Sequence, residues 1–254
     1  MTPTPRPPSL LARPEPAPVG SAKPAVLEVV GLTAGYGDLA AVRDVSLAVG
    51  RGEIVALFGA NGAGKTTTLL ATVGAIDRMA GEVRWHGRAT TQKVHQLARA
   101  GLAFVPDERS IISGLSVLDN LRIGRGAVGA ALELFPELQP LLGVNAGLLS
   151  GGQQQMLTLG RALAGLPDAL VVDELSLGLA PLVVERLLQV LRTAADERGV
   201  GVLLVEQQAH RALTVADRWY LLANGRMAAE GGGGEAGLGA LRTAFAATID
   251  RVRT

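Results

Sequence analysis

The sequence predicts an α/β fold with a helical subdomain and a small antiparallel β region. Three observations lead to this prediction. Short apolar runs typical of buried strands alternate with helix-like segments, a glycine-rich phosphate-binding motif joins one such run to a helix, and a purely helical stretch interrupts the alternation. With 254 residues the chain suits one large domain or two small ones and can bury a sizeable core.

The composition argues against several kinds of function. The 24 basic and 23 acidic residues nearly cancel, and aromatic residues make up only 3%, so nothing global favours a nucleic-acid partner. Cysteine is absent, which excludes disulfides and thiolate chemistry, and three histidines argue against a metal cluster. No apolar run is as long as a membrane span, and the run at residues 10–12 is too short for a secretory signal, so we expect a cytoplasmic protein.

The chain begins with a proline-rich stretch. Residues 1–24 hold eight of the thirteen prolines and carry almost no apolar periodicity. Such a composition buries too little surface to offset its ordering entropy, so we expect a disordered or polyproline-like tail. A proline-motif ligand for a partner domain is the alternative interpretation.

After this tail the pattern becomes that of a globular domain. Residues 26–32 are typical of a strand, and Val45, Leu47 and Val49 alternate as they do in a half-buried antiparallel strand. Between them lies Tyr36, flanked by glycines. It is either an ordinary loop residue or, at this distance before the phosphate-binding motif, a ring on which adenine stacks.

The phosphate-binding motif occupies residues 59–66 and fits G-x-x-x-x-G-K-[ST] at every fixed position. A strand-like run at 53–58 precedes it and a helix opens at 67–73, so backbone N–H groups can surround a β-phosphate. Lys65 would bridge the β- and γ-phosphates, and the Thr66 hydroxyl would bind Mg²⁺. The alternative is a glycine-rich turn with a chance Lys-Thr pair. The residues expected to bind the nucleotide are Gly59, Asn61, Gly62, Ala63, Gly64, Lys65, Thr66 and Thr67.

The segment after this motif changes from mixed to helical. The expected elements are a strand at 82–85, a helix at 94–100, a buried strand at 102–105, and helices at 116–123 and 128–134, the last ended by Pro136. Because the helices interrupt the α/β alternation, we expect a helical subdomain, about residues 107–164, that projects from the nucleotide core.

A second glycine-rich motif lies at residues 149–153, Leu-Ser-Gly-Gly-Gln, and leads directly into a helix-like segment at 156–164. A serine and two glycines at a helix start favour a second anion-binding terminus. Plain helix capping would explain Ser150 but neither the paired glycines nor the glutamines that follow.

Two carboxylates close a buried strand at residues 169–174. Asp173 can hold Mg²⁺ through water, and Glu174 can polarise a water that attacks the γ-phosphate. The alternative is a solvated turn, which four preceding apolar residues disfavour. A long amphipathic helix follows at 182–198, and a buried strand at 202–205 ends at Glu206-Gln207-Gln208, on the same sheet edge.

Three features are expected near the C-terminus. Asn224-Gly225 indicates a two-residue hairpin, residues 231–234 a flexible glycine-rich joint, and the apolar spacing from 238 to 252 a terminal helix packed on the core. Partner binding is the alternative for this helix. The expected organisation is a tail at 1–24, an ATPase domain at 25–230, and the joint with its helix at 231–254.

Over residues 26–230 the order and spacing of these motifs resemble those of ABC-transporter ATPase subunits, above all the second glycine-rich motif. The resemblance implies a P-loop NTPase fold with a RecA-like core, ATP and Mg²⁺ as cofactors, and a head-to-tail dimer with an identical or paralogous ATPase. Ser150, Gly151, Gly152 and Gln153 would contact the γ-phosphate of ATP held by the opposite subunit. Lys65, Glu174 and Gln207 would be catalytic, and Thr66, Asp107 and Asp173 would hold the metal.

Within that family the chain is similar to the LivF type of branched-chain amino-acid importer ATPase, through the stretches 105–109, 177–181 and 205–207. Importers of urea and short amides have similar ATPases. Asp107 stands where most members have a glutamine, and Gln207 where most have a histidine. Ala180 replaces an aspartate, and Leu175 a proline, which puts the rigidity of the turn after Glu174 in doubt.

The resemblance implies a motor subunit at the cytoplasmic face of the plasma membrane. Its partners would be two integral-membrane permease subunits, contacted through residues 107–125, and indirectly an extracytoplasmic solute-binding protein, with no nucleic acid. One alternative is a soluble ABC ATPase for translation or DNA repair, although the paired cassettes or coiled-coil insert of such proteins are absent here. Another is a regulatory subunit that no longer hydrolyses ATP.

Overall fold

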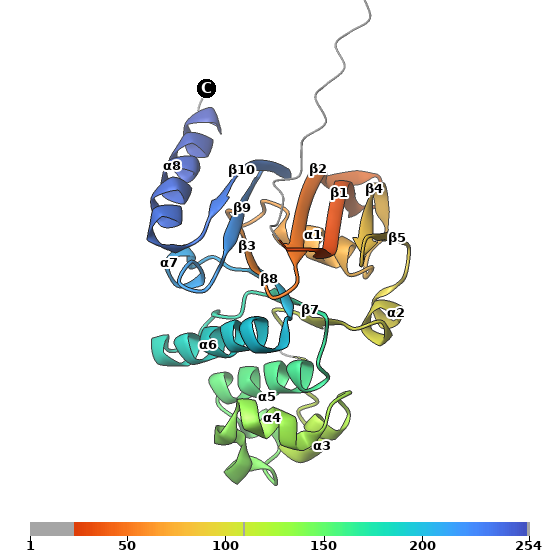
Figure 1. Cartoon of the computed structure of the whole chain (residues 1–254), viewed down its shortest axis with the longest axis vertical. Coiled ribbons are helices and arrows are strands. Elements are labelled where there is room, and N and C mark those ends of the chain that lie inside the picture. Colours follow the sequence, from red (N-terminus) through yellow and green to blue (C-terminus); the bar gives the residue numbers. More distant parts are fainter. Residues whose placement is uncertain (1–22, 109, 253–254) are drawn as a thin grey trace, which may run out of the picture.

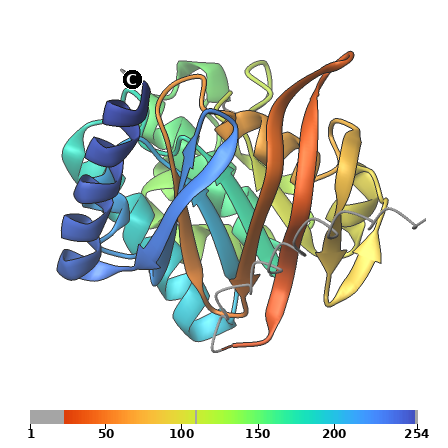
Figure 2. The same ribbon diagram turned by 90° about the horizontal axis from the view of Figure 1, so that it is seen from above.

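The structure is a computed structural model that describes residues 23–108 and 110–252 of the chain. The expected proline-rich tail therefore lies almost wholly outside the described residues. Figure 1 shows the helical subdomain at one end of the molecule, and the C-terminal helix and an antiparallel sheet at the other. Figure 2 shows this sheet and the C-terminal helix on opposite flanks, with the central strands between them.

Ten strands form two sheets in the described chain. The four-stranded sheet is antiparallel, in the order β2 (Leu39–Gly50), β1 (Ala25–Tyr36), β4 (Arg78–Trp85) and β5 (Arg88–Thr90). The six-stranded sheet has the order β10 (Arg226–Gly232), β9 (Arg218–Ala223), β3 (Ile54–Phe58), β8 (Gly201–Val205), β7 (Ala169–Asp173) and β6 (Leu102–Val105). Its strands β9 to β6 run parallel, and β10 is antiparallel to β9.

Every residue of β3, β7 and β8 is buried, as expected for parallel strands covered on both faces. The two faces of β3 belong to different hydrophobic clusters. Ile54, Ala56 and Phe58 pack with the helical side of the molecule, whereas Val55 and Leu57 pack toward the four-stranded sheet. This period of two assigns each side chain of the strand to one core.

Of the eight α-helices in the described residues, α7 (Ala209–Ala212) was not expected, and the other seven lie close to their expected positions. These seven are α1 (Lys65–Thr72), α2 (Val94–Arg99), α3 (Val117–Arg122), α4 (Val128–Leu134), α5 (Gly151–Ala164), α6 (Pro181–Arg198) and α8 (Gly234–Val252), with short 3₁₀ turns η1 (Pro136–Leu141) and η2 (Ala146–Leu148). From α3 to the end of α5 no strand occurs, which is the helical insert that the sequence predicts. None of the helices in the described residues is both long and apolar enough to cross a bilayer.

The region near the C-terminus folds as expected at the hairpin and differently at the glycine-rich joint. The Asn224-Gly225 hairpin is confirmed, because β9 and β10 pair across it and both turn residues have positive φ, 50° and 71°. The joint expected at 231–234 is wrong in its first half. Gly231 and Gly232 end β10 opposite Trp219 and Arg218. A Cβ on Gly231 would lie 2.6 Å from the Trp219 ring, so glycine serves packing there and not flexibility.

The terminal helix packs on the core as expected. Leu241 on α8 is 1% exposed and joins the larger cluster, with Leu238 and Phe245 packed beside it. Tyr36 differs from its expected place in a loop, because it is the last residue of β1 and pairs with Leu39. Its side chain is 59% exposed.

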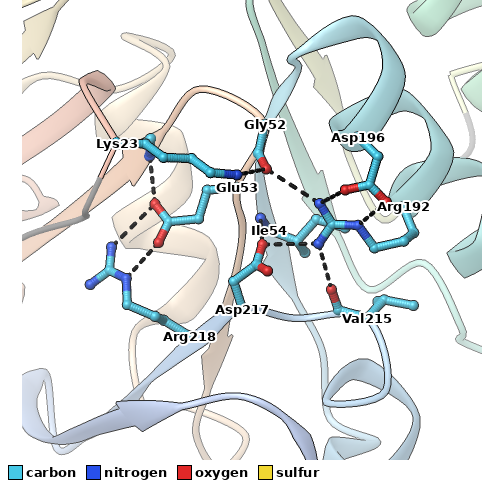
Figure 3. A network of polar contacts seen from close by, with 10 residues as sticks. Lys23, Gly52, Glu53, Ile54, Arg192, Asp196, Val215, Asp217 and Arg218 are labelled. Atoms are coloured by element: carbon cyan, nitrogen blue, oxygen red, sulfur yellow. Dashed lines mark hydrogen bonds and ion pairs between the residues drawn. The ribbon is translucent and has the colours of Figure 1, made fainter.

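A polar network closes the sheet edge where β3 and β9 begin (Figure 3). Arg218 Nε donates to Glu53 Oε1 at 2.6 Å, and Arg192 Nη1 donates to Asp217 Oδ2 at 2.9 Å. Lys23 Nζ donates to the Gly52 carbonyl oxygen at 2.8 Å. These contacts join α6 and the start of the described chain to the amino ends of the strands, leaving the carboxyl ends for the site.

Candidate nucleotide-binding site

The phosphate-binding loop connects β3 to α1 at the carboxyl edge of the sheet. Gly62 and Gly64 have φ of 79° and 103°, backbone conformations that residues with a side chain rarely adopt. At Gly59 a Cβ would lie 2.5 Å from the Leu222 carbonyl oxygen, so only glycine fits there. Lys65 Nζ donates to the carbonyl oxygens of Gly59 at 2.9 Å and Ala60 at 3.2 Å. The loop therefore keeps the Lys65 ammonium group against its own carbonyl oxygens, where it can bind an anionic ligand.

The first carboxylate lies next to this loop. Asp173 ends β7, is 2% exposed, and accepts a hydrogen bond on Oδ2 from the Thr66 hydroxyl at 3.1 Å. Burial raises the pKa of the Asp173 carboxyl to about 6; the charges of Asp107 and Glu174 add to the rise, and the hydrogen bond from Thr66 opposes it. Thus the structure brings together residues that are 107 positions apart.

The residues present fit Mg²⁺. Asp173 Oδ1 is buried without a hydrogen-bond partner, which leaves a ligand position open. A cavity of about 470 Å³ lies between Thr66, Asp107 and Asp173, all of which offer oxygen, the ligand atom that Mg²⁺ prefers. The described residues contain no group of three or more histidines, cysteines or carboxylates able to hold a metal ion. The remaining ligands would have to be phosphate and water oxygens.

Glu174 and Gln207 form a pair at the tips of neighbouring strands. Gln207 Nε2 donates to Glu174 Oε1 at 2.6 Å, and the Glu174 N–H donates to the Val205 carbonyl oxygen at 3.0 Å. Asp107, Glu174 and Leu175 line a further cavity of about 280 Å³. Two of the three expected catalytic side chains, Glu174 and Gln207, thus meet, and Glu174 borders the cavity.

The second glycine-rich motif begins α5, and its two polar residues, Ser150 and Gln153, hydrogen-bond to each other. Ser150 Oγ accepts from the Gln153 N–H at 3.3 Å, and Gln153 Oε1 accepts from the Ser150 N–H at 2.9 Å. This is a capping box, so capping explains both residues. Gly152 is explained by packing, since a Cβ there would lie 2.8 Å from Val183. α5 packs chiefly against α3, α4, α6 and β6.

Tyr36 lies on the hairpin whose second strand touches that loop. A Cβ on Gly64 would lie 2.3 Å from Val42 on β2, which shows how closely β2 approaches the loop. The Tyr36 side chain is largely exposed, so its ring is accessible to a ligand. Adenine stacking on Tyr36 stays a prediction.

Sequence reasoning missed two buried polar residues at the site. Ser176 and Glu206 are 4% and 3% exposed and hydrogen-bond to each other. Burial raises the pKa of the Glu206 carboxyl, and the hydrogen bonds from Ser176 oppose the rise. A carboxylate directly after four buried apolar residues was the signal for Glu206, whereas Ser176 carried none.

The site combines a phosphate-binding strand, loop and helix with a hydroxyl beside a buried aspartate. A glutamate lies at the same edge of the sheet. Together these features define a nucleotide-hydrolysing P-loop protein. Residues 42–176 match the family model described as ABC transporter, and the chain belongs to this family as an ATP-binding, ATP-hydrolysing subunit. Cassettes of the family dimerise and pair with permease subunits.

Several curated relatives are similar to the chain. BraG of Pseudomonas aeruginosa, a high-affinity branched-chain amino acid transport ATP-binding protein, is 42% identical over 76% of this chain and 86% of its own. The probable branched-chain amino acid transport protein LivF of Archaeoglobus fulgidus is 34% identical over 81% and 92%. The lipopolysaccharide export protein LptB of Escherichia coli K12 is 35% identical over 82% and 90%.

Solved structures agree on the fold. The ADP conformation of the cassette MJ1267 is 25% identical, with a TM-score of 0.76 over 85% of this chain and 93% of its own. The dimeric cassette MJ0796 bound to ADP and Pi is also 25% identical, with a TM-score of 0.72 over 81% and 98%. The predicted ABC cassette, with its parallel core and antiparallel β region, is confirmed.

Proposed function

We propose that this chain powers the uptake of branched-chain amino acids, as the ATP-hydrolysing subunit of an importer. The identity of 42% to BraG and 34% to LivF supports this solute class. LptB is 35% identical in sequence but is a lipopolysaccharide export protein. The assignment of the solute therefore rests on the similarity to BraG more than on overall similarity. Urea and short amides are the alternative solutes.

The observation that carries the hydrolytic mechanism is the pairing of Thr66 with Asp173 beside the Glu174–Gln207 pair. Lys65 would leave the loop carbonyls to bind the β- and γ-phosphates, and Thr66, Asp107 and Asp173 would hold Mg²⁺. When bound, Mg²⁺ neutralises charge that develops on the phosphate oxygens.

Glu174 orients the attacking water and takes its proton. Gln207 holds the Glu174 carboxylate through its amide N–H at 2.6 Å, and since an amide does not titrate it cannot accept that proton itself. A regulatory subunit without hydrolysis is disfavoured, because the phosphate-binding, metal-binding and water-orienting groups all lie at one edge of the sheet.

The active site is completed by a second ATPase subunit arranged head to tail. Ser150, Gly151, Gly152 and Gln153 would approach the γ-phosphate held by that subunit. Ser150 is exposed and therefore accessible to a second subunit, which supports a role in trans. Helix N-termini favour anions, so the start of α5 suits a phosphate.

The permease would dock in a groove beside the helical subdomain. A cavity of about 410 Å³ lies between α2, β6 and α5, and is lined by Pro106, Ser110, Gly124 and Arg125, all within or next to the expected contact segment. Ile112 and Ile123 in the same segment are 49% and 53% exposed. These features favour a transporter subunit at the cytoplasmic membrane face, with a solute-binding protein acting indirectly, over a soluble ABC ATPase.

The test of the mechanism is Glu174→Gln in the full-length protein. Removing the base should lower the rate of ATP hydrolysis at least about 100-fold, while the affinity for Mg²⁺-ATP changes little because the phosphate-binding loop is intact. Steady-state phosphate release and fluorescent-nucleotide binding measure the two quantities. Undiminished turnover would remove Glu174 from the mechanism.

The matched control is Glu185→Gln, a glutamate on α6 with no part in the proposed chemistry. It should leave both turnover and nucleotide affinity as they are. The solute class is tested separately, by reconstitution with candidate permease and solute-binding subunits and by measuring the ATP-dependent uptake of radiolabelled leucine and of radiolabelled urea. Uptake of urea without uptake of leucine would overturn the amino-acid assignment.

A further inference from the structure

A buried contact joins the loop that follows Glu174 to the loop that carries Gln207. The Ser176 N–H donates to Glu206 Oε1 at 2.9 Å, and the Ser176 hydroxyl donates to Glu206 Oε2 at 2.6 Å. Hydrogen bonds to an ionised carboxylate are short and strong, and two of them fix its orientation as well as its position. The contact therefore holds two segments that are 30 residues apart in the chain.

The contact closes a ring with the catalytic pair. A hydrogen bond of 2.6 Å joins Glu174 and Gln207. Glu174 lies two residues before Ser176 in the chain, and Gln207 directly follows Glu206. The Glu174 N–H also donates to the Val205 carbonyl oxygen at 3.0 Å. A shift of either loop must therefore stretch several hydrogen bonds at once.

Stability alone does not explain a carboxylate at position 206. Glu206 is 3% exposed, and within the described residues no lysine, arginine or histidine forms an ion pair with it that would balance its charge. Burying a charge is costly, and apolar residues of similar volume often replace such groups without loss of stability. Glu206 continues the apolar strand β8, where another apolar residue would extend the core.

The turn after Glu174 also needs an external restraint. Its first residue is Leu175, so no proline ring fixes the backbone there. Leu175 is fully buried, which anchors one side of the turn. The two hydrogen bonds from Ser176 anchor the next residue.

We propose that Glu206 is a positioning residue, which acts through Ser176 to hold Glu174 and Gln207 as one unit for the orientation of the attacking water. This inference rests on the proposed role of Glu174 in hydrolysis. Glu206 is not among the residues that line the cavities beside Asp173 and Glu174. Its effect should appear in kcat and leave nucleotide binding alone.

Two substitutions at Glu206 test the contact. Glu206→Met keeps the volume but removes both acceptors, and should lower kcat by about 10- to 100-fold, the cost of misplacing a reacting group. Glu206→Gln can still accept from the Ser176 N–H and donate to its hydroxyl oxygen, so its kcat should stay within about threefold of the original protein. Full turnover in Glu206→Met, or equal losses in both variants, would overturn the proposal.

Glu53→Gln is the matched control for lost stability. Glu53 is a second buried carboxylate, 5% exposed, at the opposite edge of the same sheet, where it accepts from Arg218 (Figure 3). It also accepts from the Gly50 N–H. It should lower the melting temperature yet leave kcat and KM for ATP unchanged. If it lowers kcat as much as Glu206→Met does, general destabilisation explains both results and the proposal fails.

A double-mutant cycle tests whether Glu206 acts through the catalytic pair. In a Gln207→Ala background the further loss from Glu206→Met should shrink to about twofold or less, because contacts that act as one unit are not additive. Independent, multiplied losses would contradict the proposed unit. This cycle requires turnover and therefore also depends on the mechanism.

Hydrogen exchange separates the contact from the mechanism. The Ser176 amide should exchange faster in Glu206→Met than in Glu206→Gln or Glu53→Gln, with no need for hydrolysis. Unchanged exchange overturns the proposal even if hydrolysis proceeds as described. Faster exchange together with full turnover in Glu174→Gln would refute the hydrolytic role and the positioning role while leaving the contact itself established.

Discussion

Glu174 has a left-handed backbone, with φ of 47°, which L-residues adopt at some cost. A proline at position 175 would restrict the preceding residue toward an extended backbone near φ of about −120°. Leu175 therefore permits the conformation in which Glu174 meets Gln207. Similar ATPases have a proline at position 175, and its absence here put the rigidity of this turn in doubt. In this chain the hydrogen bond from Gln207 holds the Glu174 carboxylate.

Leu175→Pro should therefore harm the protein. It removes a fully buried leucine and opposes the backbone of Glu174, so we expect a loss of about 2–4 kcal/mol in the free energy of unfolding. Urea denaturation measures the loss, and ATP turnover should fall with it. Leu175→Met, which conserves volume, should cost less than about 1.5 kcal/mol. Equal stability of the two variants would show that the backbone tolerates proline.

Asp173 gives a pH-dependent prediction. Its carboxyl has a pKa of about 6 in the folded protein against 3.8 as a free side chain, so the folded state keeps the proton longer and loses relative stability as the pH rises through this window. Above pH 6 the penalty reaches about 3 kcal/mol. Asp173→Asn should thus stabilise the nucleotide-free protein at pH 7 and have little effect near pH 4.

Urea unfolding of Asp173→Asn and the original protein at both pH values checks this expectation. The variant should also lose Mg²⁺-dependent hydrolysis, since an amide is a poor ligand for the ion. A stability difference that grows toward low pH would have the wrong sign and would contradict the raised pKa.

At the scale of elements, the start of α5 combines a capping role with a proposed ligand role. Ser150 and Gln153 satisfy each other's backbone N–H groups, so the helix start is stable before any nucleotide arrives. A preformed helix terminus lowers the entropy cost of binding a phosphate from another subunit. The capping box therefore prepares the surface that the proposed dimer would use.

Two substitutions separate these roles. Ser150→Ala removes the cap and should cost about 1 kcal/mol of stability, whereas Ser150→Asp caps equally well and should restore it. Both should weaken ATP-dependent dimerisation of the Glu174→Gln protein, because alanine lacks the hydroxyl and aspartate repels the γ-phosphate. Thermal unfolding and analytical ultracentrifugation report the two effects. Normal dimerisation of Ser150→Asp would remove Ser150 from the trans site.

Local signals in the sequence predicted most elements and much of the site. The apolar run before Gly59, the Asn224-Gly225 pair and the serine that begins α5 each determine their structure within a few residues. The bond between Ser176 and Glu206 joins positions 30 apart and has no local pattern. The place of Gly231 in β10 was missed because its packing partner, the Trp219 ring, is brought there only by strand pairing.

At the scale of the whole molecule, the two edges of the six-stranded sheet have separate tasks. The carboxyl edge carries the phosphate-binding loop, Asp173 and Glu174. The amino edge carries the Glu53–Arg218 pair (Figure 3). Arg218 also donates to the Ala48 carbonyl oxygen at 2.9 Å. Stability at one edge and chemistry at the other should respond separately to substitution.

Arg218→Met tests this separation. It leaves the buried Glu53 carboxylate without its cation, which should cost about 3–5 kcal/mol in the free energy of unfolding. Adding Glu53→Met should recover much of that loss, since an apolar pair replaces an ionic one. Turnover per folded molecule should stay the same in both variants. A change in KM for ATP would instead reveal coupling between the two edges.

The hydrogen bond from Lys23 to the Gly52 carbonyl oxygen has a practical consequence. It fixes the first described residue at the amino end of β3, and the phosphate-binding loop follows the other end of that strand. An affinity tag, dye or surface linker joined directly at residue 23 therefore meets the molecule on the side away from the phosphate-binding loop. Immobilisation through such a linker should leave the nucleotide site open for binding and dimerisation measurements.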